Sequence, residues 1–101
     1  MTIALCVYCA TRKWGCWTAC DACGEKPFGE DALAWSLILS DQFIDAGQIE
    51  RAAGIMRRTG KWPQVDPRGI DKAYAMVRSQ AKYFRRIKLM PPEGDAPPAP
   101  A

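Results

Sequence analysis

The sequence Cys6-Val7-Tyr8-Cys9, followed after ten residues by Cys20-Asp21-Ala22-Cys23, decides how the beginning of this chain folds. Two residues between paired cysteines allow both sulfur atoms to reach one metal ion from a single tight turn. Two such turns facing each other supply four thiolate ligands in a tetrahedral arrangement, which suits Zn²⁺. The sequence therefore predicts a structural zinc site whose ligands are Cys6, Cys9, Cys20 and Cys23.

The segment between the two cysteine pairs has the pattern of a short β-hairpin. Thr11–Trp14 and Cys16–Thr18 are rich in strand-favouring side chains, and Gly15 separates them. Gly24 follows the second pair directly, where the chain leaving such a turn often needs a positive φ that glycine adopts at little cost. Ala10 occupies the equivalent place after the first pair.

With these cysteines, the first quarter of the chain resembles the zinc-ribbon and zinc-knuckle class. The resemblance implies a zinc ribbon over residues 1–29, with one structural zinc ion on the four cysteines. It departs from the usual pattern in two ways: Ala10 stands where a glycine is common, and the linker between the pairs is short.

Other uses of the cysteines remain open at this stage. Four cysteines also hold mononuclear iron or an iron–sulfur cluster, and two disulfides are a third alternative. The chain has five cysteines and no histidine, and an odd number fits four ligands and one spare better than a disulfide framework. The spare, Cys16, is expected to be a small apolar side chain under the hairpin. The alternative is that it replaces Cys6 as a ligand.

Beyond the cysteines, the hydrophobic pattern predicts three helices. The first begins at Glu30-Asp31, is apolar on most sides from Ala32 to Ala46, and ends at Gly47, so we expect it to be the central helix. The second covers residues 48–58 and the third residues 70–89. The fold class is thus mostly α, with a zinc ribbon (1–29) packed as one cooperative unit on a three-helix domain (30–90). A Pro- and Ala-rich tail (91–101) is expected to be disordered.

Charge is distributed unevenly along the 101 residues. The formal net charge is +3, but residues 51–90 carry eleven basic and two acidic side chains, whereas acids prevail in residues 1–50. Such polarity usually indicates a charged partner. Two basic clusters are candidates for binding nucleic acid or a partner protein: one in the loop after the second helix and one on the third helix. Their members are Arg57, Arg58, Lys61 and Trp62, and Arg78, Lys82, Arg85 and Arg86.

The composition argues against several classes of function. Without histidine there is no ordinary Ser-His or Cys-His nucleophile, and four thiolates leave a zinc ion no open position for a substrate. We therefore expect no enzymatic activity and no small-molecule substrate. No apolar run reaches the length of a membrane span, and Met1–Leu5 is too short for a signal peptide, so we expect a cytoplasmic protein.

Two hypotheses for function remain. The first is a small zinc protein that binds nucleic acid through a basic helical face, in transcription, replication or its regulation. The second is a protein-interaction module, either an accessory subunit or a small inhibitor that docks on a larger machine. Trp14 and Trp17, which flank Gly15, support the second hypothesis because tryptophan is enriched in interface hot spots.

Overall fold

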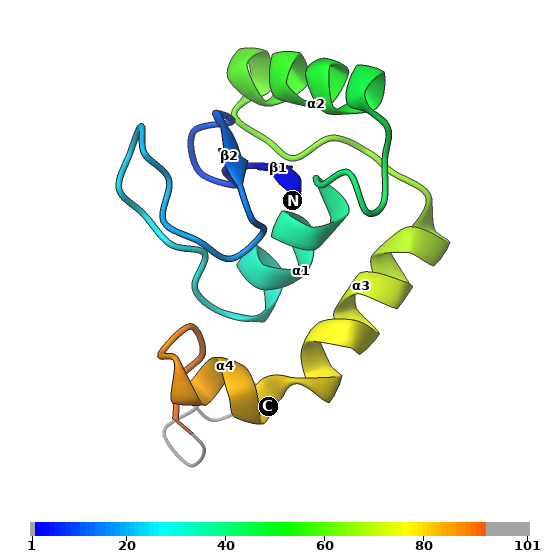
Figure 1. Cartoon of the computed structure of the whole chain (residues 1–101). Helices are drawn as coiled ribbons and strands as arrows, with labels where there is room; N and C mark the ends of the chain where they lie inside the picture. Colours follow the sequence, from blue (N-terminus) through cyan, green and yellow to red (C-terminus); the bar gives the residue numbers. More distant parts are fainter. Residues whose placement is uncertain (1, 93–101) are drawn as a thin grey trace.

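The computed structural model describes residues 2–92 and contains one two-stranded hairpin and four helices in that range (Figure 1). This agrees with the expected mostly helical fold with an N-terminal hairpin. The predicted tail lies outside the described residues from residue 93 onward. In chain order the elements are β1 (Ile3–Leu5), β2 (Arg12–Trp14), α1 (Glu30–Ile38), α2 (Ala46–Thr59), α3 (Pro67–Ser79) and α4 (Ala81–Arg86).

The hairpin forms earlier in the chain than the sequence pattern predicted. β1 pairs antiparallel with β2, with Ile3 opposite Trp14 and Leu5 opposite Arg12. The first cysteine pair therefore lies in the loop of the hairpin, and Cys16–Thr18 is not a strand. The prediction was wrong because β1 is only three residues long and begins at the chain terminus, where alternation cannot be recognised.

Helix α1 is the centre of the fold, as predicted, but it is shorter than predicted. Six of its nine residues are buried. It ends at Ile38 instead of Ala46, because Ser40 forms an antiparallel bridge with Ala4. The backbone N–H of Leu5 donates to the carbonyl of Leu39 at 3.0 Å, which places this segment along the free edge of β1.

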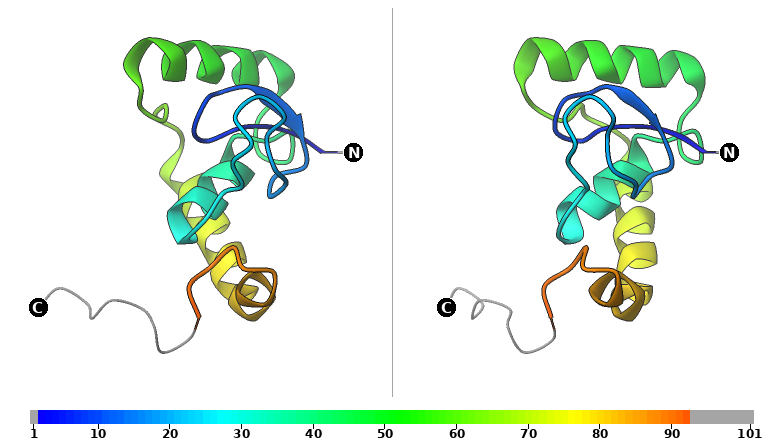
Figure 2. Two further views of the ribbon diagram at one scale, coloured as in Figure 1. Left: turned by 90° about the vertical axis from the view of Figure 1, so that its left-hand side faces the viewer. Right: turned by 60° about the vertical axis from the view of Figure 1, so that its left-hand side comes forward.

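Two apolar cores lie on opposite sides of α1. One joins α1 to α3 and α4, and includes Leu33, Val77 and Phe84. The other joins the first cysteine turn to α1 and α2, and includes Val7 and Ile49. Consequently α2 and α4 lie at opposite ends of the molecule in every view (Figures 1 and 2).

Helix α2 begins with a capping box that the sequence analysis overlooked. The Asp45 carboxylate accepts from the backbone N–H of Gln48 at 2.8 Å, and the Gln48 side-chain oxygen accepts from the backbone N–H of Asp45 at 2.9 Å. Gly47, predicted to end the preceding helix, lies instead in the first turn of α2. Gly60, with φ of 69°, ends α2 in the left-handed conformation.

The predicted third helix is two helices with different bounds. Asp66 caps α3 by accepting from the backbone N–H of Arg68, and Pro67 occupies the first helical position, so the helix begins three residues before the predicted start at residue 70. The helix then breaks at Gln80, whose φ of −114° is not helical. A continuous helix over residues 70–89 was therefore wrong. Among the described residues, no helix is both long and apolar enough to cross a bilayer.

Candidate metal centre

The four predicted ligands meet at one point. The sulfur atoms of Cys6, Cys9, Cys20 and Cys23 all lie within 4.8 Å of one another. The Cys6–Cys23 and Cys9–Cys20 pairs are each separated by 3.6 Å. A tetrahedral ion with metal–sulfur bonds of about 2.3 Å holds its sulfurs about 3.8 Å apart. The cluster is therefore sized for a single metal ion, and all five cysteines of the chain are free thiols.

The two turns that carry the cysteines have the same backbone hydrogen bonds. In the first, the N–H of Ala10 donates to the carbonyl of Cys6 at 2.9 Å, and the N–H of Cys6 donates to the carbonyl of Thr11. The second turn repeats both bonds at equivalent positions: Gly24 donates to Cys20, and Cys20 donates to Glu25. Each turn thus presents its two sulfurs in the same way, and the two turns face each other.

The residue that follows each pair has a positive φ. Gly24 has φ of 76°, as the sequence predicted, and Ala10 has φ of 64°. A left-handed conformation costs an L-residue with a Cβ about 1–2 kcal/mol. The methyl group of Ala10 is buried in the core that contains Val7 and Ile49, and this burial offsets part of the cost. Ala10 therefore adopts the same turn conformation as Gly24, although it stands where a glycine is common.

The thiols of Cys6 and Cys9 have different pKa values, so they differ in how readily they lose the proton that a metal ion replaces. In the metal-free protein, burial raises the pKa of Cys6 to about 12, although backbone N–H groups of Tyr8 and Cys9 act in the opposite direction. Burial also acts to raise the pKa of Cys9, but hydrogen bonding with Thr11 and with the neighbouring thiols of Cys20 and Cys6 together lowers that pKa to about 6. Binding of metal at neutral pH must therefore displace a proton from Cys6, whereas Cys9 loses its proton more readily than an ordinary thiol.

Lys13 supplies a buried positive charge beside the cluster, and the sequence analysis missed it. Its ammonium donates to the carbonyl of Thr18 at 2.6 Å, and only 7% of the residue is exposed. Burial lowers the pKa of Lys13, whereas the charges of the surrounding cysteine sulfurs raise it. The period-two alternation of β2 is the sequence signal for this residue, because it directs Arg12 and Trp14 outward and Lys13 inward.

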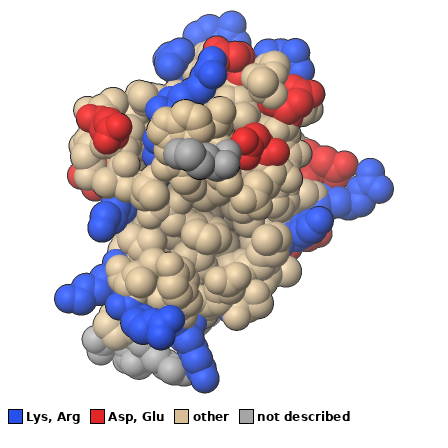
Figure 3. All heavy atoms as spheres, in the orientation of Figure 1, with Lys and Arg blue, Asp and Glu red and all other residues tan. Residues whose placement is uncertain are grey.

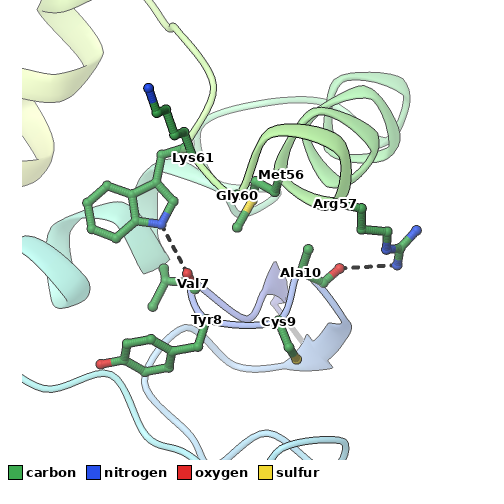
Figure 4. A pocket seen from close by; sticks show the side chains of 9 residues that line it. Val7, Tyr8, Cys9, Ala10, Met56, Arg57, Gly60 and Lys61 are labelled. Atoms are coloured by element: carbon green, nitrogen blue, oxygen red, sulfur yellow. Dashed lines mark hydrogen bonds between the residues drawn. The ribbon is translucent and has the colours of Figure 1, made fainter.

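The first cysteine turn is also the contact surface for the C-terminal end of α2 (Figure 4). The Arg57 guanidinium donates to the carbonyl of Ala10 at 3.3 Å, and the Trp62 indole N–H donates to the carbonyl of Val7 at 3.1 Å. Trp62 also stacks on Trp35, with ring centroids 5.0 Å apart. Arg57 and Trp62, which the sequence placed in a ligand-binding cluster, therefore hold the turn against the helical body.

The fifth cysteine lies apart from the metal cluster. Cys16 is buried in the core between α1, α3 and α4, where burial raises the pKa of its thiol. This confirms the expectation of a small buried side chain. The alternative, in which Cys16 replaces Cys6 as a ligand, is wrong, because Cys6 lies in the cluster and Cys16 does not.

The remaining predicted binding residues fall at two separate places. Arg58 and Lys61 are exposed at the end of α2, whereas Lys82, Arg85 and Arg86 belong to α4 at the other end of the molecule. Arg78 is exposed on α3 and forms an ion pair with Glu30 of α1. The structure therefore does not bring the two predicted basic clusters together on one face.

Comparison with protein-family models, with characterised proteins and with solved structures finds no significant match for this chain. The likeness to the zinc-ribbon and zinc-knuckle class consequently remains at the level of the four cysteines and their two turns.

Proposed function

We propose that the four cysteines hold one structural Zn²⁺ ion. Thiolate ligands in a tetrahedral set are typical of zinc, and the close approach of all four sulfurs leaves room for one ion and none for a polynuclear cluster. Four protein ligands fill the coordination shell, so the ion stabilises the fold and does not activate water. Elemental analysis of purified protein tests the identity of the bound metal. One zinc per chain supports the proposal, and a thiolate–iron absorption band in the visible would contradict it.

The proposed function of the folded chain is to bind nucleic acid through the cations of the α4 end. We use the name α4 basic end for four residues of α4 and the turn after it: Lys82, Arg85, Arg86 and Lys88. Lys82, Arg86 and Lys88 are exposed, and within residues 2–92 none of the four forms an ion pair. This concentration of uncompensated charge is the observation that carries the proposal, because phosphate neutralisation with counterion release is the main source of affinity for nucleic acid.

Three basic side chains outside the α4 basic end form ion pairs within residues 2–92: Arg12, Arg68 and Arg78. Arg12 pairs with Glu50, and Arg68 lies 3.2 Å from the Asp66 carboxylate. Figure 3 shows Lys and Arg side chains gathered at the α4 end and again around α2, with a broad uncharged area between them. A zinc tetrathiolate centre carries −2, so the formal charge of the loaded chain falls to +1. Any affinity for phosphates must therefore come from local clusters and not from the net charge.

Salt titration of binding tests this proposal directly. We expect the affinity for a labelled DNA to fall steeply between about 50 and 200 mM salt, with a linear dependence of its logarithm on the logarithm of salt concentration. The double variant Lys82→Gln/Arg86→Gln should weaken binding to all sequences and reduce the salt slope by about 2. The matched control is Arg12→Gln/Arg68→Gln, which removes the same charge from residues that are ion-paired. Equal affinities and salt slopes in the two double variants would show that the α4 basic end does not bind the nucleic acid.

A second candidate function, docking of a protein partner, is favoured by two exposed aromatic side chains beside the metal centre. Tyr8 and Phe28 are 51% and 54% exposed, and the Tyr8 hydroxyl accepts from the backbone N–H of Phe28 at 3.1 Å. Aromatic side chains anchored in this way are frequent interface hot spots. Capture of one defined protein from nuclease-treated lysate, lost in Phe28→Ser, would support this candidate. Capture that depends on nucleic acid would contradict it.

A further inference from the structure

An open groove lies between the turn after β2 and helix α3. We call it the Trp14 groove, and its volume is about 600 Å³. Trp14 and Met76 form its exposed apolar sides, with 59% and 37% of their surfaces accessible. Its remaining lining residues are Thr2, Gly15, Cys16, Trp17, Leu37, Gln42 and Gln80. No acidic side chain from the described part of the chain lines this groove.

The turn that presents Trp14 is held in place from several sides. Gly15 has φ of 87° and its N–H donates to the carbonyl of Thr2 at 2.7 Å. The Thr18 hydroxyl donates to the carbonyl of Trp14 at 2.6 Å. Trp17 is anchored below, because its indole N–H donates to the carbonyl of Leu33. An exposed indole on so constrained a turn loses little conformational entropy when a ligand stacks on it.

Two cations are near the groove residues of α3 and α4 in the sequence. Lys72 and Met76 are spaced i and i+4 on α3, so their side chains are neighbours on the helix surface. Lys72 is exposed, with its ammonium 6.0 Å from the Phe43 ring centroid. Gln80, which lines the groove, is the N-cap of α4, and Lys82 of the α4 basic end follows two residues later in the chain.

We propose that the Trp14 groove accepts unpaired nucleobases, so that the chain prefers single-stranded over duplex nucleic acid. This proposal rests on the nucleic-acid function proposed above. The flat face of a base is accessible in a single strand and hidden in a duplex, and stacking of a base on an aromatic side chain contributes about 1–3 kcal/mol. The exposed indole of Trp14, with Lys72 one helical turn from Met76 and Lys82 two residues after Gln80, combines the two features such ligands need: a stacking surface for bases and positive charge for phosphates.

Charge favours this occupant over a protein segment. A purely apolar peptide would gain nothing from Lys72 or Lys82, whereas a polyanion with flat apolar bases uses both the cations and the indole. Binding of a protein partner in this groove would therefore overturn the proposal.

The test compares binding of oligothymidylate and of a duplex of equal length by fluorescence anisotropy at one salt concentration. Trp14→Ala should weaken binding of the single strand about ten-fold and leave duplex binding unchanged, and Trp14→Phe should restore most of the loss. The Lys82→Gln/Arg86→Gln variant should weaken binding of both ligands. Because Trp14 is exposed, the variants should keep the wild-type melting temperature, which circular dichroism verifies.

Intrinsic fluorescence supplies a second measurement. Trp14 is the most exposed of the four tryptophans, so single-stranded ligand should quench a component of the emission that is missing in Trp14→Phe.

The outcomes separate the two proposals. If Trp14→Ala binds the single strand as well as wild type while the Lys82→Gln/Arg86→Gln variant is weakened, the groove proposal is overturned and the function at the α4 basic end stands. If wild type binds no nucleic acid at low salt, both proposals fail. Loss of a protein partner in Trp14→Ala, with unchanged affinity for the single strand, would also overturn the assignment of the groove to nucleobases.

Discussion

Two buried serines in and after the central helix differ in whether their hydroxyl groups have a hydrogen-bond partner. Ser36 and Ser40 are both fully buried. The Ser40 hydroxyl donates to the carbonyl of Leu37 at 2.6 Å and accepts from the backbone N–H of Gln42, which helps to end α1. The Ser36 hydroxyl has no hydrogen-bond partner among the described residues. A buried polar group without a partner costs about 1–3 kcal/mol, so Ser36 is a local weakness of the fold.

The substitution Ser36→Ala should therefore stabilise the protein. It removes an unpaired hydroxyl from a helix interior and introduces the residue with the highest helix propensity, for an expected gain of about 1 kcal/mol. The matched control, Ser40→Ala, should instead destabilise by about 1 kcal/mol because it breaks existing hydrogen bonds. Urea denaturation of the two variants provides the comparison. A loss of stability in Ser36→Ala would mean that its hydroxyl has a partner, such as a bound water molecule.

At the scale of elements, helix boundaries in this chain depend on a few capping residues. The boundary between α1 and α2 is set on one side by the Ser40–Ala4 bridge and on the other by the capping box of Asp45 and Gln48. The break between α3 and α4 has a different origin. Phe84, fully buried, meets the edge of the Trp17 ring with centroids 4.8 Å apart, and the bend at Gln80 brings α4 to this contact.

Removing the N-terminal cap of α2 should show how much this cap contributes to the stability of the protein. Asp45→Ala leaves backbone N–H groups at the helix start without their side-chain acceptor, and it should lower the free energy of unfolding by about 1 kcal/mol. Asp71→Ala, which removes an exposed carboxylate from the body of α3, is the control and should change stability by less than about 0.5 kcal/mol. Chemical denaturation is the measurement. Equal stabilities would indicate that the capping box does not determine where α2 begins.

At the scale of the whole molecule, the two turns of the four-cysteine cluster contact segments that are far apart in the chain. The first cysteine turn contacts Arg57 and Trp62, and Trp62 stacks on Trp35 of the central helix. The second turn leads into α1 through Phe28, whose N–H donates to the Tyr8 hydroxyl. Without an ion to join the sulfurs, the turns are held by the short strands β1 and β2, by the burial of Val7 and Ala10 and by these few contacts. Binding of metal should therefore contribute to the stability of both cores.

Removal of the metal should lower the melting temperature by roughly 10 °C or more and reduce near-ultraviolet circular dichroism from the tryptophans. Cys23→Ser should reproduce this loss, whereas Cys16→Ser should leave the metal content unchanged. A metal-free protein with the melting curve of the loaded protein would show that the ion does not stabilise the fold.

The stabilisation by metal should also depend on pH. Thiols must lose their protons to ligate, and burial holds the pKa of Cys6 near 12 in the metal-free protein, so protons compete with the ion more strongly as the pH falls. The difference in melting temperature between loaded and metal-free protein should thus shrink from about pH 8 to about pH 5. Retention of the full difference under acidic conditions would argue against thiolate ligation.

Local patterns in the sequence were sufficient for the features that depend on near neighbours. The spacing of the cysteines predicted both turns and their convergence, Gly24 predicted a positive φ, and the hydrophobic pattern predicted a helix over residues 48–58, where α2 lies. The capping box at Asp45 was also present in the sequence and was overlooked.

The sequence by itself determined that four sulfurs would meet and that a mostly apolar helix would follow them, because cysteine spacing and helical periodicity act over a few residues. Only the tertiary structure decided where α1 ends, which Lys and Arg side chains form ion pairs and which aromatic rings are exposed. Those outcomes depend on contacts between distant segments, such as Ser40 with Ala4, Arg78 with Glu30 and Trp62 with Trp35. Contacts of this kind follow from the packing of the two cores against α1, which no local pattern contains.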